Sequence, residues 1–136
     1  MKNLVFLLFV AVFFAACLKT TPTPQPDRIL TYMNFSNIQQ IDSAAVGDTV
    51  KINVIATGPN SCYKFEGFEG KTSGVRQYDI AAVGSIPNPA KGDTICAGGE
   101  YIKDTVFTIL PLAAGPMILR YYNSGVLYLV DTVHVK

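Results

Sequence analysis

Short stretches of alternating apolar and polar residues, each ended by a turn signal, recur from Asp27 to the end of the chain. In this region no window of eleven or more residues repeats its apolar side chains at the 3.6-residue period of a helix. An alternation with a period of two is typical of a strand that buries one of its faces. The pattern therefore argues against a helical bundle and predicts an all-β domain.

The clearest predicted strand is 49–57, in which Val50, Ile52, Val54 and Ala56 share one face. The seven predicted strands cover residues 29–35, 49–57, 62–68, 75–83, 104–110, 117–122 and 126–135. Several short strands at this spacing, with turns between them, indicate a β-sandwich or a barrel.

Two connections and one turn are also predicted. Residues 84–99 are rich in Pro and Gly and are expected to form an irregular loop, and residues 41–45 are expected to form at most one helical turn. Asn123-Ser124-Gly125 is a hairpin signal between the last two strands.

The N-terminal residues have the order of an export signal. Lys2 is followed by an apolar run from Leu4 to Phe14 and by the small residues Ala15 and Ala16. The thirteen residues from Leu4 to Ala16 fall short of the ~20 that a membrane-spanning helix needs. Residues 1–16 are therefore predicted to be a signal peptide.

The cleavage site predicts a lipid anchor. Cleavage before Cys17 would place bulky Phe14 at position −3, where the ordinary signal peptidase site has a small residue. Phe14-Ala15-Ala16-Cys17 instead resembles the lipobox of bacterial lipoproteins, which implies lipidation of Cys17. A free or disulfide-bonded Cys17 is the alternative.

Residues 17–27 are interpreted as the lipidated cysteine and a Pro- and Thr-rich tether. Pro22, Pro24 and Pro26 alternate with polar residues, which favours an extended and semi-rigid spacer. Leu18 follows the cysteine without a nearby acidic cluster, and this resembles lipoproteins of the outer membrane that face the periplasm. The predicted location is therefore the bacterial cell envelope, with residues 28–136 as the β domain.

Cys62 and Cys96 are predicted to form a disulfide, because an exported domain folds in an oxidising compartment. Closing a loop of this length would stabilise the fold by roughly 3–4 kcal/mol in the chain-entropy account. A metal or redox site is the alternative, but the chain has no C-x-x-C pair, and its single His134 is distant in sequence.

Charge and motifs argue against nucleic-acid binding and catalysis. Because Lys2 belongs to the signal peptide, the mature chain has ten basic and ten acidic residues, and the basic ones are scattered. The chain has no nucleophile elbow, P-loop or H-E-x-x-H motif. The carboxylate pairs Glu66 with Glu69 and Asp93 with Glu100 fall in turn-like surface stretches. No catalytic residue, metal or cofactor is predicted, and the chain is not expected to be an enzyme.

Tyrosines flank the predicted hairpin. Because Tyr121, Tyr122 and Tyr128 flank it, one face of the hairpin is expected to show aromatic surface, although most aromatic residues at alternating positions belong to the core. Exposed aromatic side chains can bind sugars or partners, and the alternative is that on a sandwich they simply cover the sheet.

The mature chain resembles a group of small Bacteroidota lipoproteins with an immunoglobulin-like domain. The residues that carry this resemblance are Asn60-Ser61-Cys62-Tyr63-Lys64-Phe65, Cys96, Phe107 to Ala114-Gly115, Leu119-Arg120-Tyr121-Tyr122 and Asp131-Thr132-Val133-His134-Val135. The resemblance implies a Cys62–Cys96 bridge and an immunoglobulin-like sandwich of about seven antiparallel strands, and it supplies no activity.

A second resemblance is to chagasin-type inhibitors of cysteine proteases, which are also immunoglobulin-like. Val46-Gly47-Asp48-Thr49-Val50, Gly98-Gly99 and Ala114-Gly115 occur in a similar order. The inhibitory N-P-T-T-G-Y and G-x-G-G loops would correspond to 58–63 and 96–99, whereas the R-P-W loop has no counterpart at 121–124.

We therefore expect a membrane-anchored envelope lipoprotein that acts as a non-enzymatic binding or structural module. Its expected partners are the membrane, through the lipid on Cys17, and an envelope protein or glycan. The alternative is an inhibitor of papain-type proteases.

Overall fold

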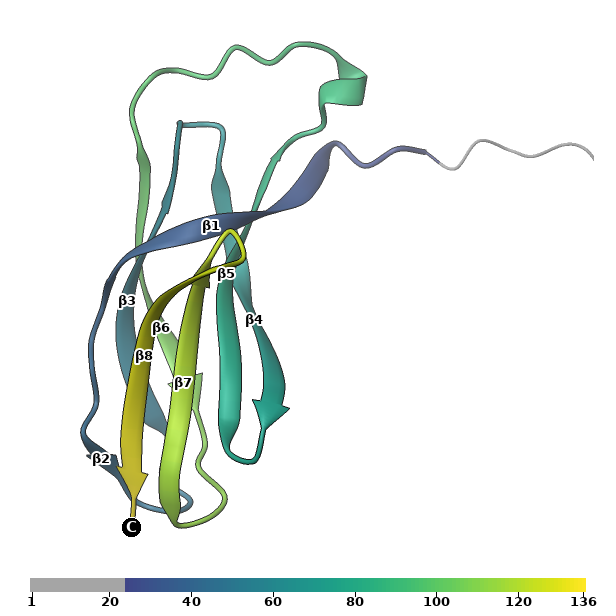
Figure 1. Ribbon diagram of the computed structural model, residues 1–136. Coiled ribbons are helices and arrows are strands. Elements are labelled where there is room, and N and C mark those ends of the chain that lie inside the picture. The colour runs from purple at the N-terminus through teal and green to yellow at the C-terminus, as the bar shows by residue number, and fades with distance from the viewer. Residues whose placement is uncertain (1–23) are drawn as a thin grey trace, which may run out of the picture.

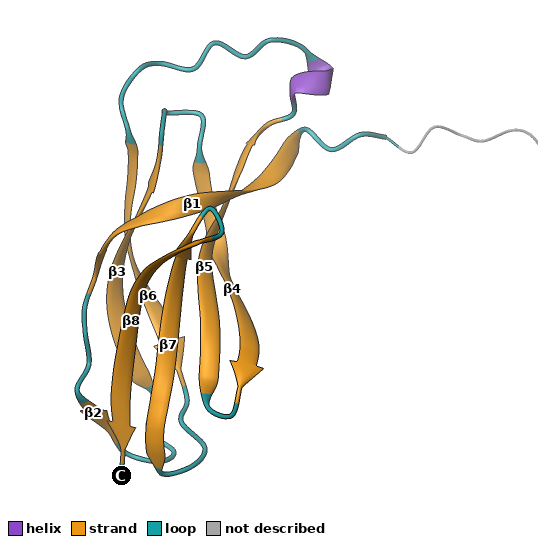
Figure 2. Ribbon diagram, in the orientation of Figure 1, coloured by secondary structure: helices purple, strands orange, loops and turns teal. Residues whose placement is uncertain are grey.

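A computed structural model describes residues 24–136, so the predicted signal peptide, Cys17 and most of the tether lie outside the described residues. The described chain is built from strands and one short 3-10 turn, which confirms the all-β prediction (Figures 1 and 2). The elements are β1 (Arg28–Ile38), β2 (Ser43–Ala44), β3 (Val50–Gly58), β4 (Lys64–Gly74), β5 (Gln77–Pro87), η1 (Pro89–Lys91), β6 (Tyr101–Ile109), β7 (Gly115–Asn123) and β8 (Val126–Val135).

The strands form one sheet that curls into a half-barrel. Their order is β2-β8-β7-β5-β1-β3-β6, and β4 pairs with the other edge of β5. In Figure 1, β8, β7, β5 and β4 form one layer, and β3 and β6 lie behind them. The apolar core fills the space between the two layers.

Strand β1 connects the two layers because it changes partner along its length. Residues 28–33 pair with β5, whereas residues 34–38 pair with β3 and include a bulge between Phe35 and Asn37. A bulge bends a strand and increases its twist. The sheet therefore bends from one layer to the other within β1. Figure 1 shows β1 crossing over the other strands.

Strand β5 has a divided edge. One edge pairs with β4, while the other pairs with β7 over 77–81 and with β1 over 82–87. β1 and β7 therefore diverge near Ala81. The described chain has eight strands, one of only two residues, where about seven were expected. The β5–β7 and β2–β8 pairs are parallel, so the expectation that the strands are all antiparallel is wrong for these two pairs.

The predicted helical turn at 41–45 is also wrong. Ser43 and Ala44 form β2 and pair with His134 and Val135 at the end of the chain. The buried carboxylate of Asp131 accepts a hydrogen bond from the Ile41 amide at 3.0 Å, which holds the segment extended along β8.

The irregular loop predicted for 84–99 begins later than expected, because β5 continues to Pro87. Gly84 lies within the strand, where a β-carbon would come within 2.6 Å of Met33 Sδ and 2.8 Å of the Lys64 carbonyl oxygen. This glycine is explained by the close approach of β1 and β4, and not by a loop.

The alternation that predicted β3 is confirmed, since Val50, Ile52, Val54 and Ala56 are all buried. In β6 the inward residues are Phe107 and Ile109, which pack against the core, while Val106 on the other face is exposed, as is Leu110 directly after the strand.

Aromatic rings close the side of the half-barrel where backbone pairing stops. The rings of Phe68 in β4 and Phe107 in β6 meet edge to face with centroids 5.3 Å apart, and Phe35 meets Tyr121 in the same way at 5.5 Å. Edge-to-face contacts of this kind are favourable beyond the burial of area. Side-chain packing thus replaces a backbone ladder between β4 and β6.

The hairpin between β7 and β8 is confirmed and holds β1 at its change of partner. Ser124 and Gly125 both have positive φ, as a two-residue type I′ turn requires. The side chain of Asn123 accepts a hydrogen bond from the Phe35 N–H at 2.7 Å and donates one to the Phe35 carbonyl at 3.0 Å. The Asn123 side chain therefore forms with the Phe35 backbone the two hydrogen bonds that a neighbouring strand would form.

Replacing Asn123 by alanine is expected to lower the free energy of unfolding by about 1–3 kcal/mol, because two partly buried backbone groups of Phe35 lose their partner. The matched control is Asn53→Ala, whose amide bonds Gln39 on the exposed face of β3 and should change stability by no more than about 0.5 kcal/mol. Urea denaturation measures both, and equal losses would contradict this role of Asn123.

Candidate binding groove

The two cysteines of the domain form the predicted disulfide. Cys62 and Cys96 are bonded, and this joins the loop after β3 to the loop before β6. The Ser61 N–H and hydroxyl also donate to the Ala97 carbonyl at 3.4 and 3.1 Å. The structure thus brings the 58–63 and 96–99 segments side by side, whereas Cys17 lies outside the described residues.

The other titratable residues considered from the sequence do not meet in one site. His134 is exposed on β8, and Asp93 and Glu100 are exposed in the long loop. Glu66 accepts a hydrogen bond from Ser85 at 2.7 Å, which lowers the pKa of its carboxyl. Within residues 24–136 no cluster of three or more metal-binding side chains occurs, and no helix there is long and apolar enough to cross a membrane.

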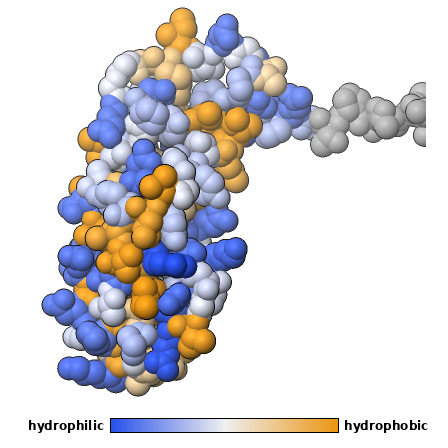
Figure 3. Space-filling model, in the orientation of Figure 1, coloured by the Kyte–Doolittle hydropathy of each residue, from blue (hydrophilic) through white to orange (hydrophobic). Residues whose placement is uncertain are grey.

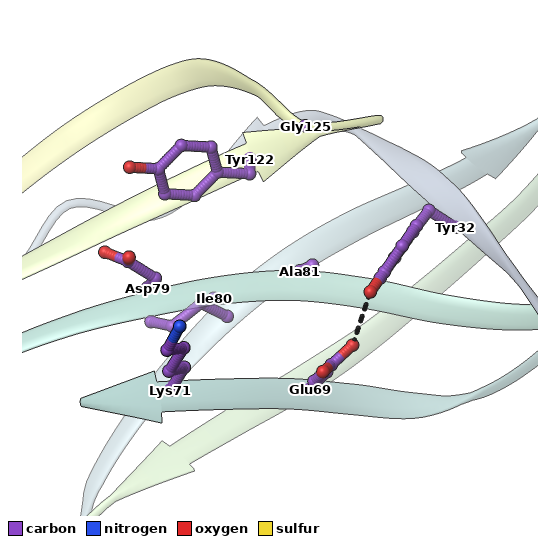
Figure 4. Close-up of a pocket in the computed structure, with 8 residues that line it drawn as sticks. All are labelled: Tyr32, Glu69, Lys71, Asp79, Ile80, Ala81, Tyr122 and Gly125. Atoms are coloured by element: carbon purple, nitrogen blue, oxygen red, sulfur yellow. Dashed lines mark hydrogen bonds between the residues drawn. The ribbon is translucent and has the colours of Figure 1, made fainter. Parts of the chain in front are cut away.

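A groove of about 320 Å³ opens on the layer formed by β4, β5, β7 and β8, on the face that points away from the core. It lies over β5, where β1 and β7 diverge (Figure 4). Ala81 lies on its floor, and its methyl side chain leaves the space unfilled. The groove is lined by Tyr32, Glu69, Lys71, Asp79, Ile80, Ala81, Tyr122 and Gly125.

The sheet register brings these side chains together in two adjacent rows. Lys71, Asp79 and Arg120 lie opposite one another on β4, β5 and β7, and two residues further along β5 the next row is Glu69, Ala81 and Tyr122. Because side chains alternate between faces, Asp79 and Ala81 point to the same side. The groove therefore combines side chains from three neighbouring strands, with Tyr32 added from β1.

Two tyrosines form the walls. Tyr32 is about half exposed, and its hydroxyl donates to the Glu69 carboxylate at 2.8 Å, which raises the pKa of the phenol (Figure 4). Tyr122 lies across the groove from Tyr32 and is half-buried. Its neighbour Tyr121 points the other way into the core, where burial and then the Asp131 charge raise the pKa of its phenol.

Charged groups at the far end of the groove are paired. Arg120 Nε lies 2.8 Å from Asp79 Oδ1, and the Ser73 hydroxyl donates to the same oxygen at 2.9 Å. Desolvation alone would raise the pKa of Asp79, but these two hydrogen bonds and the charges of Arg120 and Lys71 outweigh it and lower the pKa. With Glu69, the groove and its border carry two negative and two positive side chains.

The sequence predicted part of this surface. Tyr128 is exposed and Tyr122 lines the groove, as expected of an aromatic face on the hairpin, whereas Tyr121 is fully buried in the core. The contributions of Tyr32, Glu69 and Asp79 were missed. They are far apart in the sequence, and only the strand register brings them together.

The junction between tether and domain is fixed at the end that carries the disulfide. The Asn88 side chain donates to the Pro26 carbonyl at 2.8 Å, the Asn88 N–H donates to the Asp27 carbonyl at 2.9 Å, and Lys91 pairs with the Asp27 carboxylate. In the next residue, Arg28 donates to the Cys62 carbonyl at 2.7 Å. The chain therefore enters the domain at a defined point beside the long loop, as Figure 1 shows.

No protein-family model, curated protein or solved structure matches this chain.

Replacing Arg120 by methionine is expected to raise the pKa of Asp79, because desolvation stays while the strongest opposing hydrogen bond is lost. The native pKa lies below the ordinary value of 3.8, so the stabilisation by ionised Asp79 is present above that pH and is lost as the pH falls through the native pKa. A carbon-detected NMR titration of the carboxyl measures the shift. Lys51→Met on β3 should leave it unchanged, and an unchanged pKa in Arg120→Met would contradict the assignment.

Proposed function

We propose that this chain is a lipid-anchored lipoprotein of the bacterial cell envelope whose β domain binds another envelope component without catalysing a reaction. The observation that carries the proposal is the order of residues 1–27: an apolar run, Cys17 directly after two alanines, and then a proline-rich spacer. The proposed location is the outer membrane, with the domain facing the periplasm.

The described part of the tether supports the proposal of a display role. Asn88 bonds Pro26 and Lys91 pairs with Asp27, so these two residues of the tether are fixed against the domain. An extended spacer reaches about 3.1 Å per residue. The lipid on Cys17 would then hold the disulfide end of the domain toward the membrane and leave the sides of the sheet accessible.

We further propose that the curled sheet is a variant of the immunoglobulin-like sandwich. In that fold strands A, B and E are neighbours in one sheet, and strands C, F and G form the other. β1, β3 and β6 are neighbours in the order of strands A, B and E. β7 pairs with β8 as strand F pairs with strand G. The departure is β5, which takes the place of strand C beside β7 but runs parallel to it.

A second candidate function is inhibition of papain-type proteases. The disulfide and the Ser61–Ala97 hydrogen bonds favour it, because they place segments 58–63 and 96–99 together at one end of the sheet. Against it, residues 121–123 belong to β7, Ser124 begins the two-residue hairpin turn, and Asn123 is bonded to β1. Titration of papain with the purified chain separates the candidates: stoichiometric inhibition supports the inhibitor, and undiminished activity supports the binding module.

The intact, non-reduced mass of the chain extracted from host membranes tests the anchor. We expect the mass of residues 17–136 with a diacylglyceryl lipid and two hydrogens fewer for the Cys62–Cys96 bridge. Cys17→Ser should abolish the lipid mass and leave residues 1–16 attached, because Phe14 at position −3 does not suit the ordinary signal peptidase.

The matched control is the paired variant Cys62→Ala with Cys96→Ala, which should keep the lipid and lose roughly 3–4 kcal/mol of unfolding free energy. An unlipidated native mass would contradict the proposed anchor.

A further inference from the structure

We infer that the groove between Tyr32 and Tyr122 binds a neutral saccharide. This inference names a ligand class for the binding role proposed above and rests on that role. It is carried by the shape of the groove, by its two aromatic walls and by the balance of its charges.

The shape suits a small ring-shaped ligand. A groove of about 320 Å³ lies at the lower end of the range for small-molecule sites. Tyr32 and Tyr122 stand on opposite sides with Ala81 between them (Figure 4). The apolar C–H face of a sugar ring can pack against a tyrosine ring, which presents a flat surface at a small cost in conformational entropy.

The polar groups suit hydroxyls. Glu69 has further carboxylate lone pairs that can accept hydrogen bonds, and Lys71 donates them. The Tyr32 hydroxyl gives its proton to Glu69 and can therefore accept a hydrogen bond from a ligand. These groups surround the aromatic walls, so a ligand that is apolar on its faces and hydroxylated at its edges would meet matching chemistry on every side. A purely apolar ligand would leave the charged groups desolvated and without partners.

The charges favour a neutral ligand. Asp79 lies between Lys71 and Arg120 and is bonded to Arg120, so the border of the groove carries no large charge of one sign. A polyanion or a polycation would meet side chains of its own charge in the groove or at its border, which is unfavourable. Binding of a saccharide should therefore depend little on salt.

The strand pairing argues against an extended peptide. A peptide that adds to a sheet needs an unpaired backbone edge. Beneath the groove β5 is paired with β4 on one edge and with β7 on the other. The groove thus offers side chains instead of a backbone ladder. Figure 3 shows apolar surface on this side of the molecule. The exposed apolar residues of β8 include Val126, Leu127 and Val130, but they do not line the groove.

The test is an array of neutral oligosaccharides of hexoses and N-acetylhexosamines, printed beside acidic glycans and probed with the full mature chain in a non-glycosidic detergent. The strongest neutral binder is then titrated by calorimetry. We expect Tyr122→Ala and Tyr32→Ala each to weaken binding by about tenfold, whereas Tyr32→Phe, which keeps the ring, should weaken it less.

Tyr128→Ala is the matched control, because Tyr128 is similarly exposed but bonds Ser36 outside the groove. It should leave the affinity unchanged, and thermal melts check that every variant is folded. The inference is overturned by an array without any neutral binder, by exclusive binding of acidic glycans, or by binding that the two groove tyrosines do not affect.

The outcome is separable from that of the proposed anchor. A lipidated chain that binds no neutral glycan keeps the envelope location and overturns the saccharide assignment. An unlipidated chain that binds one through Tyr122 overturns the anchor and supports the saccharide site.

Discussion

Strand β1 leaves β5 for β3 halfway along its length, and the curled sheet depends on how the backbone is satisfied at that point. A strand that changes partner exposes N–H and C=O groups that need new hydrogen bonds. The Asn123 amide supplies them to Phe35 from the tip of the β7–β8 hairpin. This contact links residues 88 positions apart and joins the two layers, so the enclosed core around Phe35 and Tyr121 follows from it.

The same divergence that requires Asn123 also creates the groove. β5 offers one edge to both β7 and β1, and these strands separate over Ala81. Tyr32 and Tyr122 then stand on either side of the gap instead of packing on each other. The alternation of β7 sends Tyr121 into the core and Tyr122 to the groove, so one dipeptide contributes to stability and to the candidate site.

Local signals predicted the local structure. Alternation identified β3 with its buried face, the Asn-Ser-Gly turn identified the last hairpin, and cysteine usage identified the disulfide. Pairings between distant strands left no comparable signal. The parallel β5–β7 ladder needs a crossover that no single segment encodes, and Gly84 was interpreted as loop because its close neighbour Met33 is remote in sequence. The groove was missed for the same reason, since Tyr32, Glu69 and Asp79 meet only through register.

Amide hydrogen exchange at Phe35 tests the central claim most directly. If the Asn123 side chain completes the sheet at the change of partner, the Phe35 N–H should exchange as slowly as the amides of the buried strand β3, through opening of the whole domain. Exchange as fast as in the exposed loop around Asp93 would show that β1 is not held there, and would contradict the account of both the curled sheet and the groove.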